Sequence, residues 1–269
     1  MESKDNAQIG VFGGSGFYSF LKQRKEVEIK TPYGNPSDNV TIGKVEGIKV
    51  AFIPRHGSSH TIPPHKINYR ANVWAMKQLG VTQIFGPCAA GSLQPHIKPG
   101  DFVICDQFVD RTNSRADTYY DGPKTIHITS AEPYCPRMGK AIYGAAQSMG
   151  MDCRPKGTVV VIQGPRFSTK AESRWYSKQG WEVINMTQYP EAYLARELEI
   201  CYSNISLITD YDAGLEDNPD IEPVTTEEII KMFQQNTEKL RELLFKSITN
   251  LTEKRDCFCP KALKNAVIN

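Results

Sequence analysis

The sequence lacks the features that mark membrane-bound, secreted or nucleic-acid-binding proteins. No apolar run approaches the roughly 20 residues that a transmembrane helix requires, and the amino-terminal stretch has no apolar signal-peptide core. The 32 basic and 30 acidic residues leave a net charge of only +2, which provides no electrostatic attraction to nucleic acid or to a membrane surface. We therefore expect a cytoplasmic protein with neither partner.

Internal repeats and low-complexity tracts are also missing from the chain. The 269 residues, 40% of them hydrophobic, are enough for one sizeable core. Single α/β domains commonly reach about 250 residues. Strand-like and helix-like segments alternate along the sequence, so we expect an α/β fold in which residues 1–269 form one domain. Residues 255–269 would be its carboxyl-terminal tail.

Sequence motifs typical of metal-binding sites are only weakly represented in this chain. The tail contains Cys257-Phe258-Cys259, but no other pair among the seven cysteines has the spacing of a second zinc-ligand pair. The remaining cysteines lie in or beside expected elements, where a thiol behaves as a small buried hydrophobe. Four of the five histidines fall between His56 and His96, but prolines interrupt them and no zinc-protease helix motif occurs. We expect no metal. A local disulfide between Cys257 and Cys259 is an alternative interpretation of this pair.

Segment 160–212 has a pattern that predicts strand, helix, strand, helix, strand, and both apolar and acidic candidate ligand-binding residues follow its strands. Phe167 follows the first of these strands, Met186 the second, and Asp210 and Asp212 the third. The two aspartates are two positions apart and share a face if the backbone stays extended. In an open α/β sheet, ligands bind beyond the carboxyl ends of the strands. The segment therefore predicts a pocket for a flat, nitrogen-rich ring.

Three other strand ends suit an anion. The strand at 9–13 runs into a glycine-rich turn with Ser15, where backbone N–H groups can face a phosphate. A plain tight turn is an equal alternative there, and a dinucleotide-binding loop would need a following helix. Arg55 and His56 follow the strand at 48–53; taken alone, a surface arginine and a capping histidine are the simpler interpretation. Cys88 and Ala89 begin a run of small residues, which allows either ligand approach or tight packing.

Other segments carry further expectations. Residues 107–133 form a long irregular stretch, which in a compact domain is usually functional or at an interface. The acidic, proline-containing segment 214–224 is a candidate lid. Thr169 and Glu172 have the spacing of a helix capping box. A second helix is expected after the next strand, which ends near residue 187. The charged residues of this second helix predict a solvated face: Glu191, Arg196, Glu197 and Glu199.

Anion-binding elements beside a ring pocket predict phosphorolysis of a purine nucleoside. Phosphate would attack the anomeric carbon, the sugar would pass through an oxocarbenium-like state, and the departing base would need neutralising. This chemistry requires no covalent nucleophile. A phosphate-independent nucleosidase would have no use for Arg55 and His56. A non-enzymatic nucleotide-binding module would have no use for Asp210 and Asp212.

Five motifs in order, GGSG, PRHG, GPRFS, INMT and TDYD, carry a resemblance that covers about residues 10–248. Through them the chain resembles the trimeric purine nucleoside phosphorylase superfamily, and within it the 5'-methylthioadenosine phosphorylase branch. The resemblance implies a mixed twisted sheet flanked by helices. It also implies a homotrimer or a dimer of trimers that acts in purine and methionine salvage. Inorganic phosphate would be a co-substrate, with no cofactor.

The resemblance also implies roles for individual residues. The phosphate-binding set is Ser15, Arg55, His56, Cys88, Ala89 and Thr187. Cys88 stands where animal relatives have threonine, so its contact with phosphate would come through the backbone N–H. Phe167 would stack on the purine, Met186 would line the ribose, and His127 would reach a neighbouring subunit's site. Members from hyperthermophilic archaea carry disulfides, including one in a carboxyl-terminal C-x-C. In this chain Cys257 could pair with Cys259, and Cys135 could pair with Cys201; both pairings stay open.

Base specificity depends on two positions. Relatives selective for 6-oxopurines resemble this chain but have glutamate at the position of Ser168 and asparagine at that of Asp210. Asp210 would act at purine N7 as an acid or a hydrogen-bond partner, and Asp212 would accept from the 6-amino group. The sequence therefore predicts a preference for adenine. A broad purine nucleoside phosphorylase that also cleaves adenosine, inosine or guanosine is the alternative.

Overall fold

The computed structural model describes residues 6–13, 22–215, 219, 221, 226–252 and 254–268. An 11-stranded mixed sheet forms its centre. The main path of the sheet runs β2 (Lys22–Val27), β3 (Val40–Val45), β4 (Ile48–Pro54), β1 (Ile9–Gly13), β5 (Gln83–Ser92), β11 (Val183–Asn185), β10 (Thr158–Ile162) and β7 (Gln107–Arg111). Strand β12 (Cys201–Tyr211) branches from β5 and pairs with β6 (Phe102–Val103), which pairs with β9 (Cys153–Arg154). The expected α/β class and mixed sheet are confirmed.

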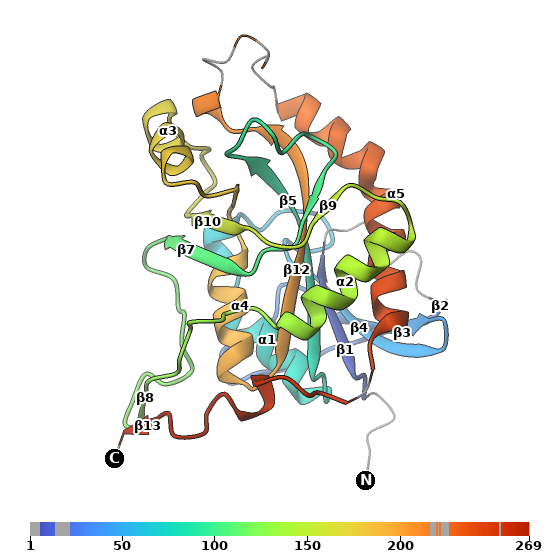
Figure 1. Cartoon of the computed structure of the whole chain (residues 1–269). Coiled ribbons are helices and arrows are strands. Elements are labelled where there is room, and N and C mark those ends of the chain that lie inside the picture. The colour runs from blue at the N-terminus through green and yellow to red at the C-terminus, as the bar shows by residue number, and fades with distance from the viewer. Residues whose placement is uncertain are drawn as a thin grey trace.

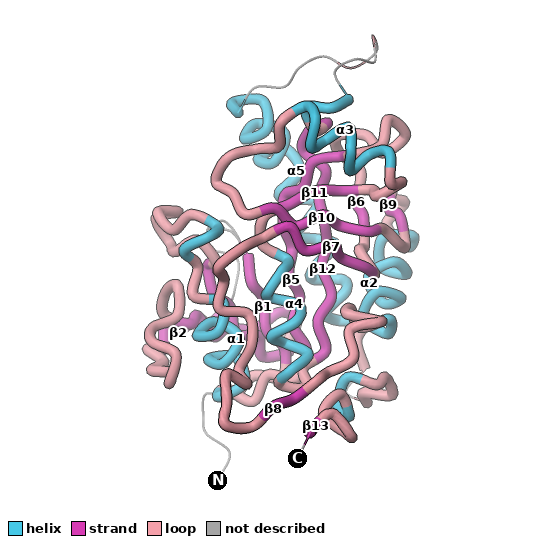
Figure 2. The backbone as a smooth tube through the Cα atoms, turned by 90° about the vertical axis from the view of Figure 1, so that its left-hand side faces the viewer, coloured by secondary structure: helices cyan, strands magenta, loops and turns pink. Residues whose placement is uncertain are grey.

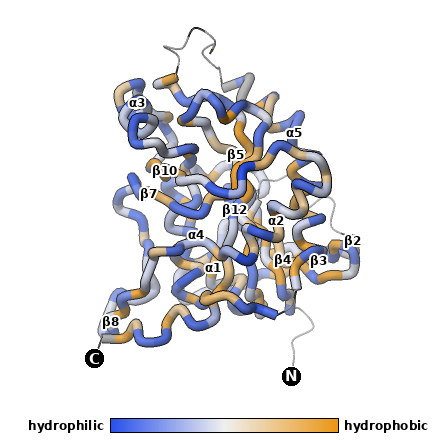
Figure 3. The backbone as a smooth tube through the Cα atoms, in the orientation of Figure 1, coloured by the Kyte–Doolittle hydropathy of each residue, from blue (hydrophilic) through white to orange (hydrophobic). Residues whose placement is uncertain are grey.

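Helices cover both faces of the sheet (Figures 1 and 2). Helices α1 (Tyr69–Gln78) and α4 (Gln188–Glu197) pack into one hydrophobic core, and α2 (Pro136–Ser148) and α5 (Thr226–Asn250) into a second core. Hydrophobic residues concentrate in the central strands, whereas the helices alternate between hydrophobic and hydrophilic positions (Figure 3). No helix in the described part of the chain combines the length and apolar content needed to cross a bilayer.

Short elements complete the fold. Helix α3 (Lys170–Lys178) packs on the 3-10 turn η3 (Ala213–Leu215). The other 3-10 turns are η2 (Pro64–Lys66) and η4 (Cys259–Lys261). Strands β8 (Thr125–Ile126) and β13 (Val267–Ile268) form a separate two-stranded sheet that ties the carboxyl-terminal tail to the segment around residue 126.

The predicted helix capping box is confirmed. The side chain of Thr169 accepts a hydrogen bond from the Glu172 backbone N–H at 3.2 Å, and the Glu172 carboxylate accepts from the Thr169 backbone at 2.8 Å. This capping box starts α3. Strands β3 and β4 form an antiparallel hairpin, and Glu46 and Gly47 at its turn have φ angles of 46° and 86°.

Strand β12 is buried along most of its length, as its nearly continuous apolar sequence predicts. It runs parallel to β5 in register from Cys201 to Ile208 and again from Asp210. The register shift between these two stretches leaves Thr209 as a bulge. Bulges redirect the side chains that follow them, and they recur next to active sites. This bulge lies directly before Asp210.

Segment 107–133 was expected to be irregular, but it contains β7, which pairs in parallel with β10. The strand was missed because its sequence, QFVDR, lacks the apolar alternation of a half-buried strand. It lies at the edge of the sheet and stays partly exposed.

The prediction of a solvated charged face on α4 is wrong for three residues. Glu191, Arg196 and Glu197 are all buried, each between 1% and 5% exposed. Each has found a polar partner inside the fold. Glu197 accepts hydrogen bonds from Thr118 and the Tyr119 backbone, and Arg196 donates to a backbone carbonyl. Helical periodicity alone could not reveal these partners, because they come from distant segments.

The glycine-rich turn with Ser15 lies outside the described residues, as does most of the candidate lid at 214–224. Of the lid segment, residues 214 and 215 belong to η3.

The contact between β5 and β12 leaves no room for a side chain at Gly86. A Cβ atom there would lie 2.0 Å from the Tyr202 hydroxyl oxygen. We expect Gly86→Ala to lower the free energy of unfolding by about 1–3 kcal/mol, the usual range for overpacking. Gly144 in α2 is the matched control, since a Cβ there meets nothing within 4 Å. Gly144→Ala should be neutral or stabilising by about 0.5–1 kcal/mol. Urea denaturation measures both, and equal stability of the two variants would contradict the tight contact.

Candidate active site

A cavity of about 840 Å³ lies where the carboxyl ends of β4, β10, β11 and β12 meet the middle of β5. Nine of the residues singled out from the sequence line it: Arg55, His56, Cys88, Ala89, Phe167, Met186, Thr187, Asp210 and Asp212. The fold therefore brings these strand ends to one cavity, and the roles of the residues stay predictions.

Arg55 is the buried cation of the cavity. It follows β4, and its guanidinium donates to both carboxylate oxygens of Glu191, at 2.6 and 2.8 Å. It also donates to the carbonyls of Phe12 and Pro87, at 3.2 and 3.4 Å. Burial by itself lowers the pKa of Arg55, but the ion pair with Glu191 outweighs it and raises the pKa. Of the five guanidinium N–H groups, these bonds within the described residues engage four, leaving one on Nη1 for a ligand.

Glu191 is a site residue that sequence reasoning missed. Besides Arg55 it accepts a hydrogen bond from the Tyr202 hydroxyl at 2.7 Å. A carboxylate that receives a bidentate arginine contact fixes the plane of the guanidinium. The chain thus holds Arg55 in one orientation at the cavity wall. No spacing in the sequence connects residues 55 and 191.

His56 faces the cavity as a neutral imidazole. Its Nδ1 lies 2.8 Å from the Ile62 carbonyl oxygen, which can only accept, so Nδ1 carries the proton. Burial lowers the pKa of His56 to about 4, and the charge of Arg55 contributes to this shift. The ring of His60, which also lines the cavity, stacks on His56 with centroids 4.6 Å apart. The Nε2 atom of His56 is therefore an acceptor at neutral pH.

Cys88 turns its side chain into a polar network rather than leaving it free for a ligand. Its sulfur receives contacts from Asn185 and Gln188 at 3.4 and 3.6 Å, and lies 3.6 Å from the Ser206 hydroxyl. Ala89, the next residue, is exposed in an otherwise buried strand. This arrangement supports the expectation that this part of β5 meets a ligand through its backbone.

Two carboxyl groups lie on the β12 side of the cavity. Burial raises the pKa of Asp210, and a 2.6 Å hydrogen bond from Thr209 only partly offsets it. Burial also raises the pKa of Asp212, with repulsion from Asp210 adding to the effect. One oxygen of Asp212 is buried without a hydrogen-bond partner among the described residues. A buried unpaired acceptor beside a cavity is suited to a donor on a ligand.

Apolar side chains form the remaining walls. Phe167 is 54% exposed, unusually high for a phenylalanine, and Met186 lies on β11's side of the cavity. The sequence did not predict that helix α5 would form a wall. It contributes Ile230, Phe233, Gln234, Thr237 and Leu240.

Two predicted residues do not line the cavity. Ser168, next to Phe167, has a buried hydroxyl that lies near the Asp212 carboxyl group. His127 lies beside β8, where its backbone N–H donates to Ala266 at 2.9 Å. Figures 1 and 2 both place β8 at the far end of the molecule from α3. His127 does not line the cavity of its own chain.

The cavity thus combines a fixed cation, two carboxyl groups with raised pKa values and an exposed aromatic ring. A cation with partly free N–H groups binds an anion. Protonated carboxyl groups donate hydrogen bonds and ionised ones accept them, so the pair can contact a heterocycle with both kinds of group. A bound anion and a bound ring would then share one chamber.

Comparisons with known proteins agree with this chemistry. The model of the phosphorylase superfamily matches residues 8–249. A purine nucleoside phosphorylase of Streptomyces coelicolor is 49% identical over 98% of this chain and 96% of its own. An S-methyl-5'-thioadenosine phosphorylase of Thermofilum pendens is 48% identical, over 98% of this chain and all of its own length.

Solved structures give the same result. A crystal structure of a methylthioadenosine phosphorylase from an antarctic soil metagenomic library superposes with a TM-score of 0.92 at 36% identity, covering 98% of this chain and 93% of that one. An adenosine/methylthioadenosine phosphorylase mutant of Schistosoma mansoni, in complex with adenine, has a TM-score of 0.89 at 32% identity, covering 97% and 99%. Together with the strand-end cavity, these matches show that the chain belongs to the phosphorylase superfamily.

Proposed function

We propose that this chain catalyses the phosphorolysis of 5'-methylthioadenosine to adenine and 5-methylthioribose 1-phosphate, a salvage reaction. The observation that carries the proposal is the single cavity that joins Arg55 to the carboxyl pair Asp210 and Asp212. The Thermofilum pendens relative bears the name of this activity at 48% identity over its whole length.

Phosphate binding is assigned to the end of the cavity at Arg55, with His56, Cys88, Ala89 and Thr187 around it. The remaining N–H of the guanidinium would donate to a phosphate oxygen. His56 is a neutral acceptor at Nε2, so it suits the one hydroxyl group of the hydrogen-phosphate dianion. Ser15 is expected to add a further contact.

The purine is assigned to the end of the cavity at Asp210 and Asp212, with Phe167 stacked on the ring. A phosphate oxygen attacks the anomeric carbon as the bond from that carbon to purine N9 breaks. The bond electrons go to the base, and protonation at N7 neutralises them. Asp210, whose pKa is raised by burial, can retain the proton that it would give to N7. Asp212 would accept a hydrogen bond from the 6-amino group. Ser168, whose hydroxyl lies near Asp212, would take part in the same contact with the base.

The apolar wall of α5 supports an apolar group at the 5' position of the sugar. Ile230, Phe233 and Leu240 offer no charge to a 5'-phosphate. A second candidate function is a broader purine nucleoside phosphorylase. The Streptomyces coelicolor relative, 49% identical, carries that name.

Assembly and location follow from the resemblance. We expect a homotrimer or a dimer of trimers in the cytoplasm, with His127 reaching the cavity of a neighbouring subunit. Its position outside the cavity of its own chain is consistent with this role.

The direct test is adenine release from 5'-methylthioadenosine at neutral pH, with and without phosphate. We expect release only with phosphate, accompanied by 5-methylthioribose 1-phosphate. Equal release without phosphate would identify a nucleosidase instead. Phosphorolysis of inosine without cleavage of 5'-methylthioadenosine would favour the broader alternative and overturn the assignment of the carboxyl pair.

Glu191→Gln should weaken phosphate binding. It removes the charge that fixes Arg55, and hydrogen bonds to charged groups contribute about 1.5–3 kcal/mol. We therefore expect the KM for phosphate to rise about tenfold or more, with a smaller change in the KM for the nucleoside. Glu197→Gln is the matched control, because Glu197 is equally buried on the same helix but bonds to Thr118 and Tyr119 instead. Equal effects of both variants on the KM for phosphate would show that Glu191 acts only on stability.

Asp210→Asn should lower kcat on 5'-methylthioadenosine by about 10²-fold or more, the usual contribution of a general acid. An Asn amide can also face a 6-oxo group, so the relative use of inosine should rise. The wild-type kcat should fall as pH rises through the raised pKa of Asp210, because the carboxyl then loses its proton. Asp210→Asn should lack this alkaline decline. An unchanged ratio of the two substrates, measured beside the remote control Asp152→Asn, would reject the role.

A further inference from the structure

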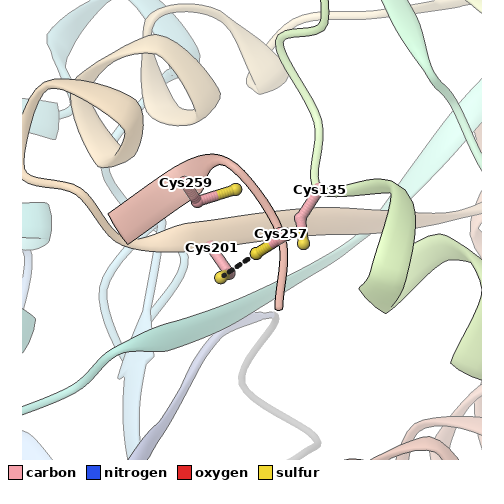
Figure 4. Close-up of side chains that lie close together, drawn as sticks. All are labelled: Cys135, Cys201, Cys257 and Cys259. Atoms are coloured by element: carbon pink, nitrogen blue, oxygen red, sulfur yellow. Dashed lines mark hydrogen bonds between the residues drawn. The ribbon is translucent and has the colours of Figure 1, made fainter. Parts of the chain in front are cut away.

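The fold gathers four cysteines at a point away from the cavity (Figure 4). Cys135 precedes α2, Cys201 opens β12, Cys257 lies in the tail and Cys259 begins η4. Their four sulfur atoms all lie within 4.8 Å of one another, and those of Cys201 and Cys257 are 3.4 Å apart. All but Cys257, which is half-buried, are buried.

The arrangement suits a tetrahedral metal better than it suits covalent pairs. Zinc–sulfur bonds of about 2.3 Å place the corners of a tetrahedron about 3.8 Å apart. Sulfur separations of up to 4.8 Å require only small side-chain rotations to reach that value. A disulfide would bring two sulfurs to about 2.05 Å. All seven cysteines are free thiols in the structure, and no two of the four clustered sulfurs lie at disulfide distance.

We propose that Cys135, Cys201, Cys257 and Cys259 bind one zinc ion as a structural tetrathiolate site. The sequence showed only the pair in the tail, because the second pair comes from residues far apart in the chain. The fold supplies that pair by placing the start of α2 beside the start of β12. The expectation of no metal, made from spacing alone, could not take this into account.

The ligands sit on backbone that is already held. The Cys135 N–H donates to the Tyr202 carbonyl at 2.8 Å, and the Cys201 N–H donates to the Thr82 carbonyl at 3.0 Å. Three of the four cysteines also lie at the starts of regular elements: Cys135 at α2, Cys201 at β12 and Cys259 at η4. Ligands on such elements need little reorganisation when a metal binds.

Charge near the cluster also favours a metal thiolate. Zinc with four thiolates carries a net charge of −2, which is costly to bury without a nearby cation. The guanidinium of Arg137 lies close enough to Cys201 and Cys257 to interact with both. It is anchored there by a hydrogen bond to the side chain of Gln83.

A site with four protein ligands leaves no open coordination position, so its role would be structural rather than catalytic. It would fasten the tail to the body of the molecule. Beyond η4 the tail continues to β13, which pairs with β8 directly before His127. The metal would thus support the segment that we expect to reach a neighbouring subunit.

The first test uses the unmodified protein, purified under reducing conditions without added chelator. We expect about one zinc per chain by elemental analysis, as a closed structural site requires. Exchange for cobalt should give the visible bands of tetrahedral cobalt with an intense sulfur-to-cobalt charge-transfer band. Removing zinc with a strong chelator should lower the melting temperature, and zinc should restore it.

Variants locate the metal. Cys259→Ser and Cys257→Ser should each lose most of the zinc, whereas Cys153→Ser, which changes a thiol outside the cluster, should retain it. The measurement on the unmodified protein keeps the test valid if a cluster variant fails to fold. Two findings would overturn the proposal. One is a reduced protein that contains no zinc and gives no tetrahedral cobalt spectrum. The other is a mass lowered by the hydrogens lost to two disulfides, Cys135–Cys201 and Cys257–Cys259.

Discussion

The buried ion pair between Arg55 and Glu191 is the interaction on which the site depends. It joins the end of β4 to α4 through two hydrogen bonds, and Tyr202 adds a third bond from β12. Removing one member of such a pair costs about 3–5 kcal/mol, because the other charge stays buried without compensation. The pair is therefore both a structural connection and the reason why a cation can face the cavity in a fixed orientation. Gly86 is needed beside it because any side chain would displace Tyr202.

The position of the carboxyl pair depends on backbone geometry instead. The bulge at Thr209 turns the end of β12 so that Asp210 and Asp212 both line the cavity. Burial then raises the pKa of each carboxyl group. A carboxyl group with a raised pKa can donate a proton or a hydrogen bond to a heterocycle when it is protonated, and can accept a hydrogen bond when it is ionised. A fixed positive group and a pair of tunable carboxyl groups in one chamber are the arrangement that transfer of a sugar from purine to phosphate requires.

Much of this could be predicted from the sequence, because strand ends are local features. The apolar pattern of β12 located Asp210 and Asp212, and the capping box located the start of α3. Partnerships between distant segments could not be predicted. Glu191 was assigned to a solvated face because its helix shows alternating charge, and only the fold brings Arg55 to it. The wall formed by α5 and the meeting of four cysteines have the same origin, since both arise from packing rather than spacing.

A crystal structure with 5'-methylthioadenosine and sulfate, which mimics phosphate without reacting, tests the central claim most directly. The account predicts sulfate at Arg55 and Thr187, on the opposite side of the sugar from a purine stacked on Phe167. The 6-amino group should point to Asp212, and N7 should lie within hydrogen-bond distance of Asp210. Sulfate bound away from Arg55, or a purine with its 6-amino group turned away from both carboxyl groups, would contradict the account.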